Sequence, residues 1–232
     1  MVRFALTLLW FIMALFYAAF LYPFYVLSGR KIGKNIGRNI FTMGLWLNKV
    51  KLDVEGRENI DPGEKYLVVS NHQSVFDIPI VCSALTVEVR IFAKKELAKV
   101  PLFGQLLYLY DFVFVDRKNK REAVRNLKKA SEIMKRYSFL VFPEGTRSVD
   151  GKVQPFKTGA VSLAQDSNVM ILPVAILDSR KIMEKGRLKI NPGTVKVKIF
   201  EPVKVSPGEK RKEIAEKLHA VISQYIEKNL ET

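Results

Sequence analysis

YLVVSNHQSVFD, at residues 66–77, is the stretch that decides the fold we expect for this chain. Its first part is an uninterrupted apolar run, which is typical of a buried strand. Polar residues end the run, and His72 and Asp77 follow at a separation of five residues. A histidine exchanges protons near neutral pH, and a carboxylate beside it can fix its tautomer and support its charge. We therefore interpret the pair as a candidate general base.

The spacing of this pair sets a structural condition. Five residues along an α-helix turn through about 500°, so His72 and Asp77 on one helix would point apart. They can meet only if the chain bends between the strand and the next helix, with His72 outside the helix. Pro79 suits a turn here, because it biases Ile78 away from helical dihedral angles.

The rest of the chain alternates strand-like runs with helical patterns. NIDPGE, at residues 59–64, is a turn signal and marks a plausible domain boundary. The alternation after it predicts an α/β domain over residues 59–232, with a mixed, largely parallel sheet flanked by helices. Besides 66–69, the expected strands are residues 90–93, 112–115, 139–142, 169–176 and 194–200, and the clearest helical pattern between them covers 123–134.

The end of the chain carries its own helix signals. SPGE, at residues 206–209, is a capping box with proline at the first helical position. The pattern beyond it predicts a last helix with one apolar face. The residues of that face are Ile214, Leu218, Val221 and Tyr225.

The first 58 residues differ in character from the rest. Residues 4–27 are almost wholly apolar; as a helix they would be about 36 Å long, enough for a hydrocarbon core of about 30 Å. Residues 32–47 form an amphipathic pattern with Trp46 near its end, where indole rings favour lipid headgroups. We predict a two-helix membrane anchor over residues 1–58. The apolar stripe of its second helix is Ile32, Ile36, Ile40, Met43 and Leu47.

Two arrangements of this anchor are open: a single span, or a hairpin inserted into one leaflet. The monotopic hairpin is favoured, because the second helix is suited to lying in the interface. Two buried helices of a soluble domain are a third alternative. No cleavage site of the signal-peptide type stands out, so the segment is expected to be retained. Basic residues between the two helices place the rest of the chain at the cytoplasmic face of the cell membrane.

Composition narrows the kind of partner. The chain has 232 residues, of which 48% are hydrophobic and 26% charged, and a formal charge of +15. Such a charge favours an anionic partner: nucleic acid, anionic lipid or a phosphorylated substrate. No helix-turn-helix, zinc or RNA-binding signature is present, so we expect no nucleic acid. The single cysteine, Cys82, stands in an apolar run and is interpreted as a buried structural thiol.

Positive groups recur where predicted strands end or a helix starts. An arginine fork matches phosphate oxygens, and glycine lets backbone N–H groups approach a ligand. Each cluster alone has an ordinary explanation as a polar turn or a surface charge. Together with 71–77, they predict a converging anion site at the strand ends. The stretches are AKKEL at 93–97, FVDR at 114–117, PEGTRS at 143–148 and FKTGA at 156–160, where Lys157 or Thr158 lies near a helix N-terminus.

Four of these blocks occur in an order that resembles the glycerolipid acyltransferases. Within that group the chain is similar to the bacterial lysophosphatidic acid acyltransferases, whose product is phosphatidic acid. Firm motifs cover residues 66–174, and the likeness extends more loosely over the whole length. The blocks are NH-x4-D at 71–77, FV-x-R at 114–117, FPEGTRS at 142–148 and V-x3-PV at 169–174.

The resemblance implies a mechanism. His72 removes the proton of the free sn-2 hydroxyl of lysophosphatidate, while Asp77 holds the imidazole. The alkoxide attacks the thioester carbonyl of an acyl carrier protein or of acyl-coenzyme A, and no serine or cysteine nucleophile is required. The residues that the resemblance implies for the acceptor phosphate are Lys94, Arg117, Glu144, Gly145, Thr146 and Arg147.

The expected partners are membrane lipids, lysophosphatidate and the acyl thioester; neither a cofactor nor a metal is predicted. Residues 117–136 carry nine Lys or Arg and two acidic residues. They are either a solvated helix face or a surface for lipid headgroups, coenzyme A phosphates or an acidic carrier. Competing functions are a glycerol-3-phosphate or other lysophospholipid acyltransferase, a thioester hydrolase in which His72 activates water, and a non-catalytic membrane binder.

Overall fold

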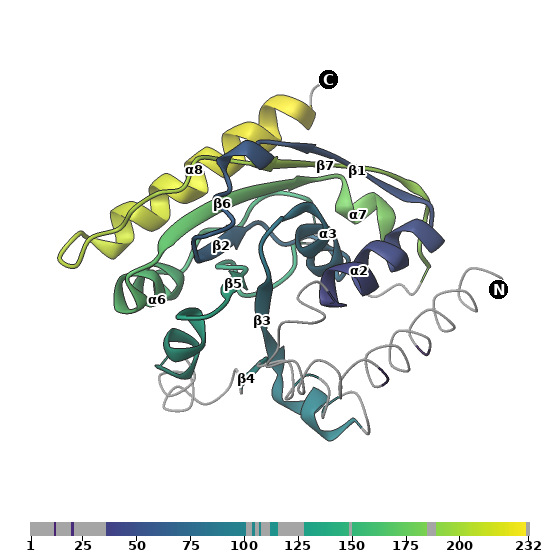
Figure 1. Cartoon of the computed structure of the whole chain (residues 1–232). Helices are drawn as coiled ribbons and strands as arrows, with labels where there is room; N and C mark the ends of the chain where they lie inside the picture. The colour runs from purple at the N-terminus through teal and green to yellow at the C-terminus, as the bar shows by residue number, and fades with distance from the viewer. Residues whose placement is uncertain are drawn as a thin grey trace.

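The computed structural model describes residues 36–100, 104, 107, 112–115, 128–148, 150–184 and 189–230, together with 12 and 20. In these residues the chain has an α/β fold around a seven-stranded sheet in the order β1-β7-β6-β2-β5-β3-β4 (Figure 1). The strands are β1 (Val50–Glu55), β2 (Tyr66–Ser70), β3 (Val89–Lys94), β4 (Val113–Val115), β5 (Ser138–Val141), β6 (Met170–Leu177) and β7 (Gly193–Ile199).

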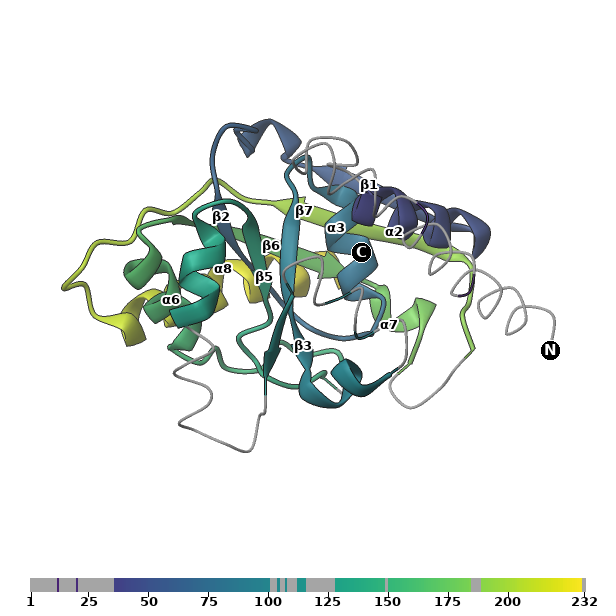
Figure 2. The ribbon, with the colours of Figure 1, turned by 60° about the horizontal axis from the view of Figure 1, so that its bottom comes forward.

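Helices cover both faces of this sheet. Figure 2 shows α6 and α8 on one side of the sheet and α2 and α3 on the other. The helices whose bounds lie within the described residues include α2 (Ile36–Leu47), α3 (Asp77–Ala84), α6 (Gly159–Ser167), α7 (Ser179–Ile182) and α8 (Arg211–Leu230), with the short 3-10 helices η1 (Arg57–Asn59) and η2 (Lys95–Lys99). Residues 128–134 are helical as well.

The predicted mixed, largely parallel sheet is confirmed. β2 runs parallel to both β5 and β6, and β3 runs parallel to β5 and β4. β7 is antiparallel to β6, while β1 is parallel to β7. Because β2 to β6 all run in one direction, their carboxyl ends lie at the same edge of the sheet. The loops after β2 and β5, which carry His72 and the PEGTRS stretch, are therefore neighbours.

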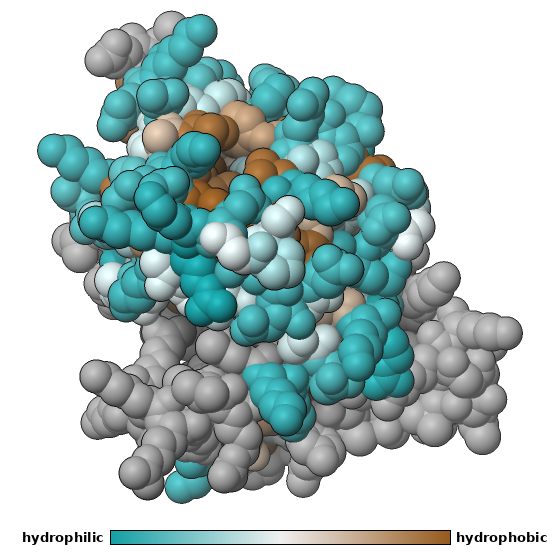
Figure 3. Space-filling view, turned by 90° about the vertical axis from the view of Figure 1, so that its left-hand side faces the viewer, coloured by the Kyte–Doolittle hydropathy of each residue, from teal (hydrophilic) through white to brown (hydrophobic). Residues whose placement is uncertain are grey.

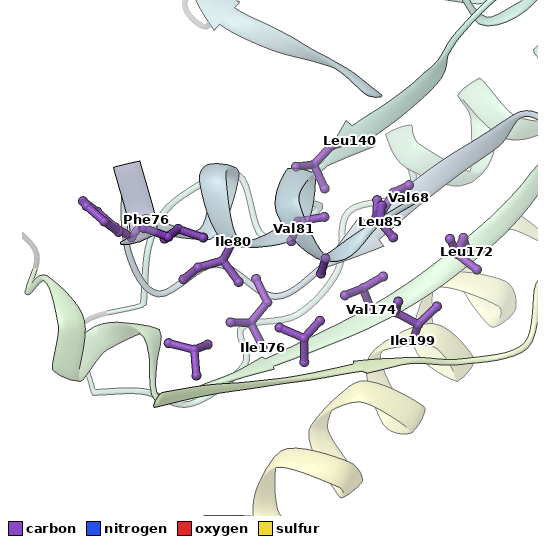
Figure 4. Packing of buried hydrophobic residues seen from close by; sticks show 14 of the residues in the cluster. Val68, Phe76, Ile80, Val81, Leu85, Leu140, Leu172, Val174, Ile176 and Ile199 are labelled. Atoms are coloured by element: carbon purple, nitrogen blue, oxygen red, sulfur yellow. The ribbon is translucent and has the colours of Figure 1, made fainter. Parts of the chain in front are cut away.

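The core has two layers, one on each face of the sheet. β2 is buried throughout and supplies both: Tyr66 and Val68 point to the α3 side, and Leu67 and Val69 to the α6 and α8 side. This explains why its sequence is apolar without alternation. Figure 4 shows the first layer, in which side chains of α3 pack over the neighbouring strands. Its labelled residues are Val68, Phe76, Ile80, Val81, Leu85, Leu140, Leu172, Val174, Ile176 and Ile199.

The surface is mostly polar where it can be seen. Figure 3 views the molecule from the side on which α6 and the first turns of α8 lie, and this face is largely hydrophilic with a small hydrophobic area. Many apolar side chains of the described residues instead pack in the two layers of the core.

The sheet starts earlier in the chain than the predicted boundary at 58/59. β1 lies inside segment 1–58, which the sequence pattern assigns to the membrane anchor, yet it pairs with β7 from Val50 opposite Gly193 to Glu55 opposite Lys198. β1 is an edge strand whose residues alternate between buried or half-buried and exposed. Charged residues at alternate positions give β1 no continuous apolar run, so the sequence pattern does not indicate a strand. The pairing with β7 identifies it.

α2 is part of the folded domain as well. It covers residues 36–47 of the helix expected at 32–47 and packs on α3, with Leu45 buried in the core and the Thr42 hydroxyl donating to Ser83 Oγ (3.2 Å). Trp46 is 74% exposed. The expected apolar helix at 4–27 lies outside the described residues apart from positions 12 and 20. No helix in the described ranges combines the length and the apolar character needed to cross a bilayer.

Two helix starts differ from the predictions. Ile78 is helical, because α3 begins at Asp77 and holds Pro79 in its first turn, where a backbone N–H has no partner within the helix. α8 begins only at Arg211, because Gly208 has a φ of 98°, which is incompatible with helix. The Ser206 N–H does reach the Glu209 carboxylate, as in a capping box.

The buried face of α8 is also rotated from the predicted one. Ile214 and Leu218 are buried as expected, whereas Val221 is 42% exposed. Ile222 takes its place, four residues after Leu218. The neighbouring position was ambiguous in the sequence, because both Val221 and Ile222 are apolar and adjacent.

Candidate active site

His72 and Asp77 meet at the carboxyl edge of the sheet. His72 Nδ1 lies 2.7 Å from Asp77 Oδ2, and the two side chains are 15% and 0% exposed. His72 stands in the loop after β2, and Asp77 is the first residue of α3. The structure thus meets the condition that the chain bend between them, although the bend covers residues 71–76 and ends before Pro79.

Asp77 contacts the imidazole and also stabilises the conformation of this loop. Its Oδ2 also accepts hydrogen bonds from the backbone N–H groups of Gln73 (2.6 Å) and Ser74 (2.8 Å). The Ser74 hydroxyl donates in turn to the Met183 carbonyl (2.7 Å). One buried carboxylate oxygen therefore gathers three donors and sets the distance between His72 and itself.

Asn71 fixes the start of the same loop. Its side-chain amide donates to the Ile176 carbonyl (2.9 Å) and accepts from the Ile176 N–H (2.8 Å). The amide group thus imitates a backbone pair and continues the β2–β6 ladder by one residue beyond Ser70. This contact holds the backbone that leads into His72.

The His72 ring is held from its face by an aromatic ring. Phe142 stacks on it with a centroid distance of 4.0 Å and an interplanar angle of 13°. With a proton on Nδ1 directed at Asp77, Nε2 carries the free lone pair, and within the described chain no hydrogen-bond partner occupies it. This is the tautomer that a general base needs.

Glu144 connects the loop after β5 to the His72 loop. It is 4% exposed; its Oε1 accepts from the His72 N–H (2.6 Å) and its Oε2 from the Gln154 N–H (2.9 Å). Both oxygens are thus taken by backbone groups, so Glu144 acts on the shape of the site. Burial raises the pKa of Glu144 to about 7, against the lowering effect of the two N–H groups and with a smaller contribution from the Asp77 charge.

This pKa predicts a pH-dependent effect of Glu144→Gln on stability. A carboxyl whose pKa is raised by folding stabilises the protein fully below pH 4.5 and loses that contribution as the pH rises to about 7. Glutamine has no such dependence. The free energy of unfolding of Glu144→Gln, relative to the wild type, should therefore increase by up to about 3 kcal/mol between these pH values. Urea titrations at several pH values measure it.

Glu132→Gln provides the control, because Glu132 is exposed and, among the described residues, its carboxylate pairs with Lys135 alone. The stability difference between this variant and the wild type should change little over the same pH range. A Glu144→Gln difference that is constant from pH 4.5 to pH 8 would contradict the raised pKa.

The predicted PEGTRS loop lies directly beside His72. The Ser148 N–H donates to the His72 carbonyl (2.8 Å), and the Gly145 N–H to the Phe142 carbonyl (3.0 Å). Gly145 has a φ of 74°, which favours glycine there. Gly145 and Thr146 are exposed, and Arg147 is half-buried. The loop that carries Arg147 therefore lies at the same edge of the sheet as His72.

The structure does not place the side chains of two other predicted site residues. Lys94 is the last residue of β3, which ends at the same edge of the sheet, but only its backbone is described. Arg117 follows β4 in the sequence and lies outside the described residues. Their predicted part in phosphate binding stays a prediction.

Neither the cysteine nor the second histidine takes part in this site. Cys82 is buried in α3, and desolvation raises the pKa of its thiol to about 12, so it is no nucleophile at neutral pH. His219 stands on α8 with Nε2 3.3 Å from the Val153 carbonyl and its ring edge-on to Phe156. Both are structural side chains.

Several contributions to this site have no clear signal in the sequence. The stacking of Phe142 on His72 depends on the register of β2 with β5, which only the fold supplies. The partners of Glu144 are backbone N–H groups, which almost every residue type supplies, so the sequence does not indicate them. Asn71 is the exception, because an amide directly after a buried strand suggests that it continues the strand's hydrogen bonding.

Comparisons of sequence point to one group of proteins. Residues 51–177 match the family model described as Acyltransferase. The 1-acyl-sn-glycerol-3-phosphate acyltransferase of Limnanthes alba is 32% identical over 175 residues, which cover 75% of this chain and 62% of the plant protein. The alpha form from Mus musculus is 30% identical over 193 residues, covering 82% of this chain and 68% of the mouse protein. The chain thus spans less than two thirds of the plant relative.

The fold gives a similar result. The crystal structure of the 1-acyl-sn-glycerophosphate (LPA) acyltransferase PlsC from Thermotoga maritima superposes with a TM-score of 0.78 at 32% sequence identity. The match covers 97% of this chain and 94% of that one. The stretch matched by the family model includes His72, Asp77 and the whole PEGTRS loop.

Proposed function

Because the chain belongs to the acyltransferase family, with 1-acyl-sn-glycerol-3-phosphate acyltransferases among its relatives, we propose that it acylates the sn-2 hydroxyl of lysophosphatidate. The acyl group comes from a thioester, carried by an acyl carrier protein or by coenzyme A, and the product is phosphatidate. One observation carries the proposal: the contact of 2.7 Å between His72 Nδ1 and Asp77 Oδ2 beside a loop that carries Arg147.

The first step is removal of a proton. His72 Nε2 takes the proton of the sn-2 hydroxyl as its oxygen attacks the thioester carbonyl. The imidazole becomes positively charged, and the Asp77 carboxylate stabilises that charge through the Nδ1–H hydrogen bond. The ring stays in place because Phe142 covers one face and Asp77 holds one edge.

The second step releases the thiol. The tetrahedral intermediate collapses, the carbon–sulfur bond breaks, and the departing thiolate receives the proton from His72 Nε2. One ester bond forms, one thioester bond breaks, and the histidine returns to its starting tautomer. The reaction therefore uses no covalent acyl-enzyme, which agrees with the structural role of Cys82.

The acceptor is held by its phosphate. Arg147 offers a planar fork that matches two phosphate oxygens, and Gly145 leaves the loop backbone open on its exposed side. Lys94 and Arg117 are further ligands proposed from the sequence. Since the Ser148 N–H binds the His72 carbonyl, phosphate binding and proton removal take place on one connected loop pair.

Arg147→Ala should raise the apparent KM for lysophosphatidate by about tenfold or more and leave the KM for the thioester nearly unchanged. The reason is that a charge-assisted hydrogen bond to phosphate contributes about 1.5–3 kcal/mol. Initial rates with each substrate varied in turn measure both constants. Arg136→Ala is a matched control, because Arg136 is exposed and precedes β5 at the opposite edge of the sheet. Equal effects on both substrates would contradict a phosphate role.

The N-terminal segment provides membrane attachment in this proposal. The acceptor and product of the proposed reaction are membrane lipids. The apolar residues 4–27, followed by the amphipathic pattern at 32–47, suit insertion into one leaflet. The exposed indole of Trp46 at the end of α2 supports contact with headgroups. The catalytic domain then works at the cytoplasmic face of the cell membrane.

An acceptor panel tests the proposed function. Purified protein is given a labelled acyl thioester on each carrier, with lysophosphatidate, glycerol 3-phosphate or another lysophospholipid. Transfer to lysophosphatidate at the highest kcat/KM is expected. A preference for another acceptor would move the chain to a different acyltransferase class. Thioester release that needs no acceptor would make it a hydrolase.

A further inference from the structure

Lys157 reaches into the PEGTRS loop from the segment before α6. Its backbone N–H donates to the Pro143 carbonyl (3.1 Å), so the two segments run side by side. Its side chain then lies across Gly145: a β-carbon built on that glycine would be 2.6 Å from Lys157 Nζ and 3.5 Å from its Cε. The ammonium group is therefore placed against the backbone of the loop that carries Arg147.

The charge of this ammonium is not used within the described part of the chain. Lys157 is exposed, and no carboxylate of the described residues lies within ion-pair distance of its Nζ. The carboxylate nearest in the loop, Glu144, is buried with both oxygens bound by the His72 and Gln154 N–H groups. Lys157 thus presents a positive charge at the loop that no carboxylate of the described residues compensates.

Gly145 is suited to this arrangement for two separate reasons. Its φ of 74° is a conformation that side chains disfavour, and the space where its β-carbon would stand is taken by the Lys157 ammonium. Glycine at this position therefore allows the turn and also leaves room for the Lys157 ammonium beside the loop. Lys157 and Arg147 together give the loop two cationic groups on a short stretch of surface.

We propose that Lys157 is a ligand of the acceptor's phosphate and acts together with Arg147. The inference rests on the proposed function, since the phosphate is that of lysophosphatidate. A phosphomonoester carries up to two negative charges, which one guanidinium does not neutralise; an ammonium supplies a second, compact charge. The phosphate and the sn-2 hydroxyl are only a few covalent bonds apart. Ligands on the loop bonded to the His72 backbone are thus well placed to align that hydroxyl with Nε2.

Lys157→Met and Lys157→Arg test this role by steady-state kinetics. Methionine keeps the length of the side chain and removes its charge, whereas arginine keeps the charge. Lys157→Met should raise the KM for lysophosphatidate about tenfold, which corresponds to about 1.4 kcal/mol, with the KM for the thioester within about twofold. Lys157→Arg should recover most of that loss. Lys152→Met is the matched control in the same segment, because Lys152 is exposed and the three atoms nearest to the β-carbon position of Gly145 all belong to Lys157.

Each other outcome overturns the inference. A raised KM for the thioester alone would assign Lys157 to phosphates of the donor. A lower melting temperature with both KM values unchanged would make it a structural lysine. A KM for lysophosphatidate as low as that of the wild type would exclude any phosphate contact.

A binding experiment separates this inference from the proposed function. The 2-deoxy analogue of lysophosphatidate has the phosphate but no hydroxyl to acylate, and its affinity is measured by calorimetry without turnover. Lys157→Met should weaken that affinity about tenfold relative to the wild type and to Lys152→Met. If the wild type acylates a different acceptor but this difference in affinity is found, the proposed function fails and the role of Lys157 stands. Equal affinities of the three proteins would end the inference even if the wild type makes phosphatidate.

Discussion

His72→Ala should lower kcat by about 10²- to 10⁴-fold, the range in which a general base contributes to a reaction. Alanine removes the only group at this edge, among the described residues, that the geometry equips to take a proton from the acceptor hydroxyl. The loop itself should survive, because Asp77 Oδ2 still binds the N–H groups of Gln73 and Ser74. The KM for lysophosphatidate should change little, since its phosphate ligands are intact. Initial rates of phosphatidate formation measure both.

His219→Ala is the matched control for this variant. It removes the other histidine of the chain, which lies on α8; its partners among the described residues are Val153, Phe156 and Ser223. Its kcat should stay within a few-fold of the wild type. A His72→Ala variant that keeps more than a small fraction of the wild-type kcat would show that another group takes the proton.

Asp77→Asn should lower kcat on the order of 10²-fold while leaving the fold intact. Asp77 Oδ2 receives three donors, whereas Oδ1 is buried with no hydrogen-bond partner in the described structure. An asparagine can place its oxygen at the Oδ2 position and its amide nitrogen at the Oδ1 position. The hydrogen bonds that hold the His72 loop are then kept, and the negative charge that stabilises the imidazolium is lost. The amide N–H groups at the buried Oδ1 position meet no acceptor among the described residues, so a modest loss of stability is expected as well.

The measurement is kcat together with the melting temperature. Asp166→Asn is the control, because Asp166 is exposed on α6 and its removal should change neither quantity by much. An Asp77→Asn enzyme within about threefold of the wild-type kcat, at an unchanged melting temperature, would mean that Asp77 only shapes the loop. A large fall in melting temperature would mean that the charge itself holds the fold.

Much of the α/β domain follows from local patterns. The run at residues 66–69, apolar without alternation, predicts a strand buried on both faces, and β2 is such a strand. The five other expected strands match β3 to β7 within one residue at each end. β1 is not predicted, because it is an edge strand with charged residues at alternate positions. It forms a strand by pairing with β7, which is remote in sequence. The face of α8 was ambiguous between two adjacent apolar residues.

The sequence predicted that His72 and Asp77 meet, but not which residues hold them in place. A histidine and an aspartate at an unhelical spacing demand a bend, and the bend is present between β2 and α3. Which residues hold that bend could not be foreseen, because Glu144 and Asp77 work through backbone N–H groups. The approach of Lys157 to Gly145 likewise depends on two loops that meet only in the fold. Residue type and spacing predict which side chains are candidates for the chemistry, whereas the tertiary structure determines which groups position them.

The most direct test of the central claim follows a labelled acyl group to its product. Wild-type protein and His72→Ala are incubated side by side with a radiolabelled acyl thioester and lysophosphatidate, and the lipids are separated. We predict that the wild type moves the label into the sn-2 ester of phosphatidate and that His72→Ala leaves it on the thioester. Label released by the wild type as free fatty acid, or phosphatidate made by His72→Ala at close to the wild-type rate, would contradict this account.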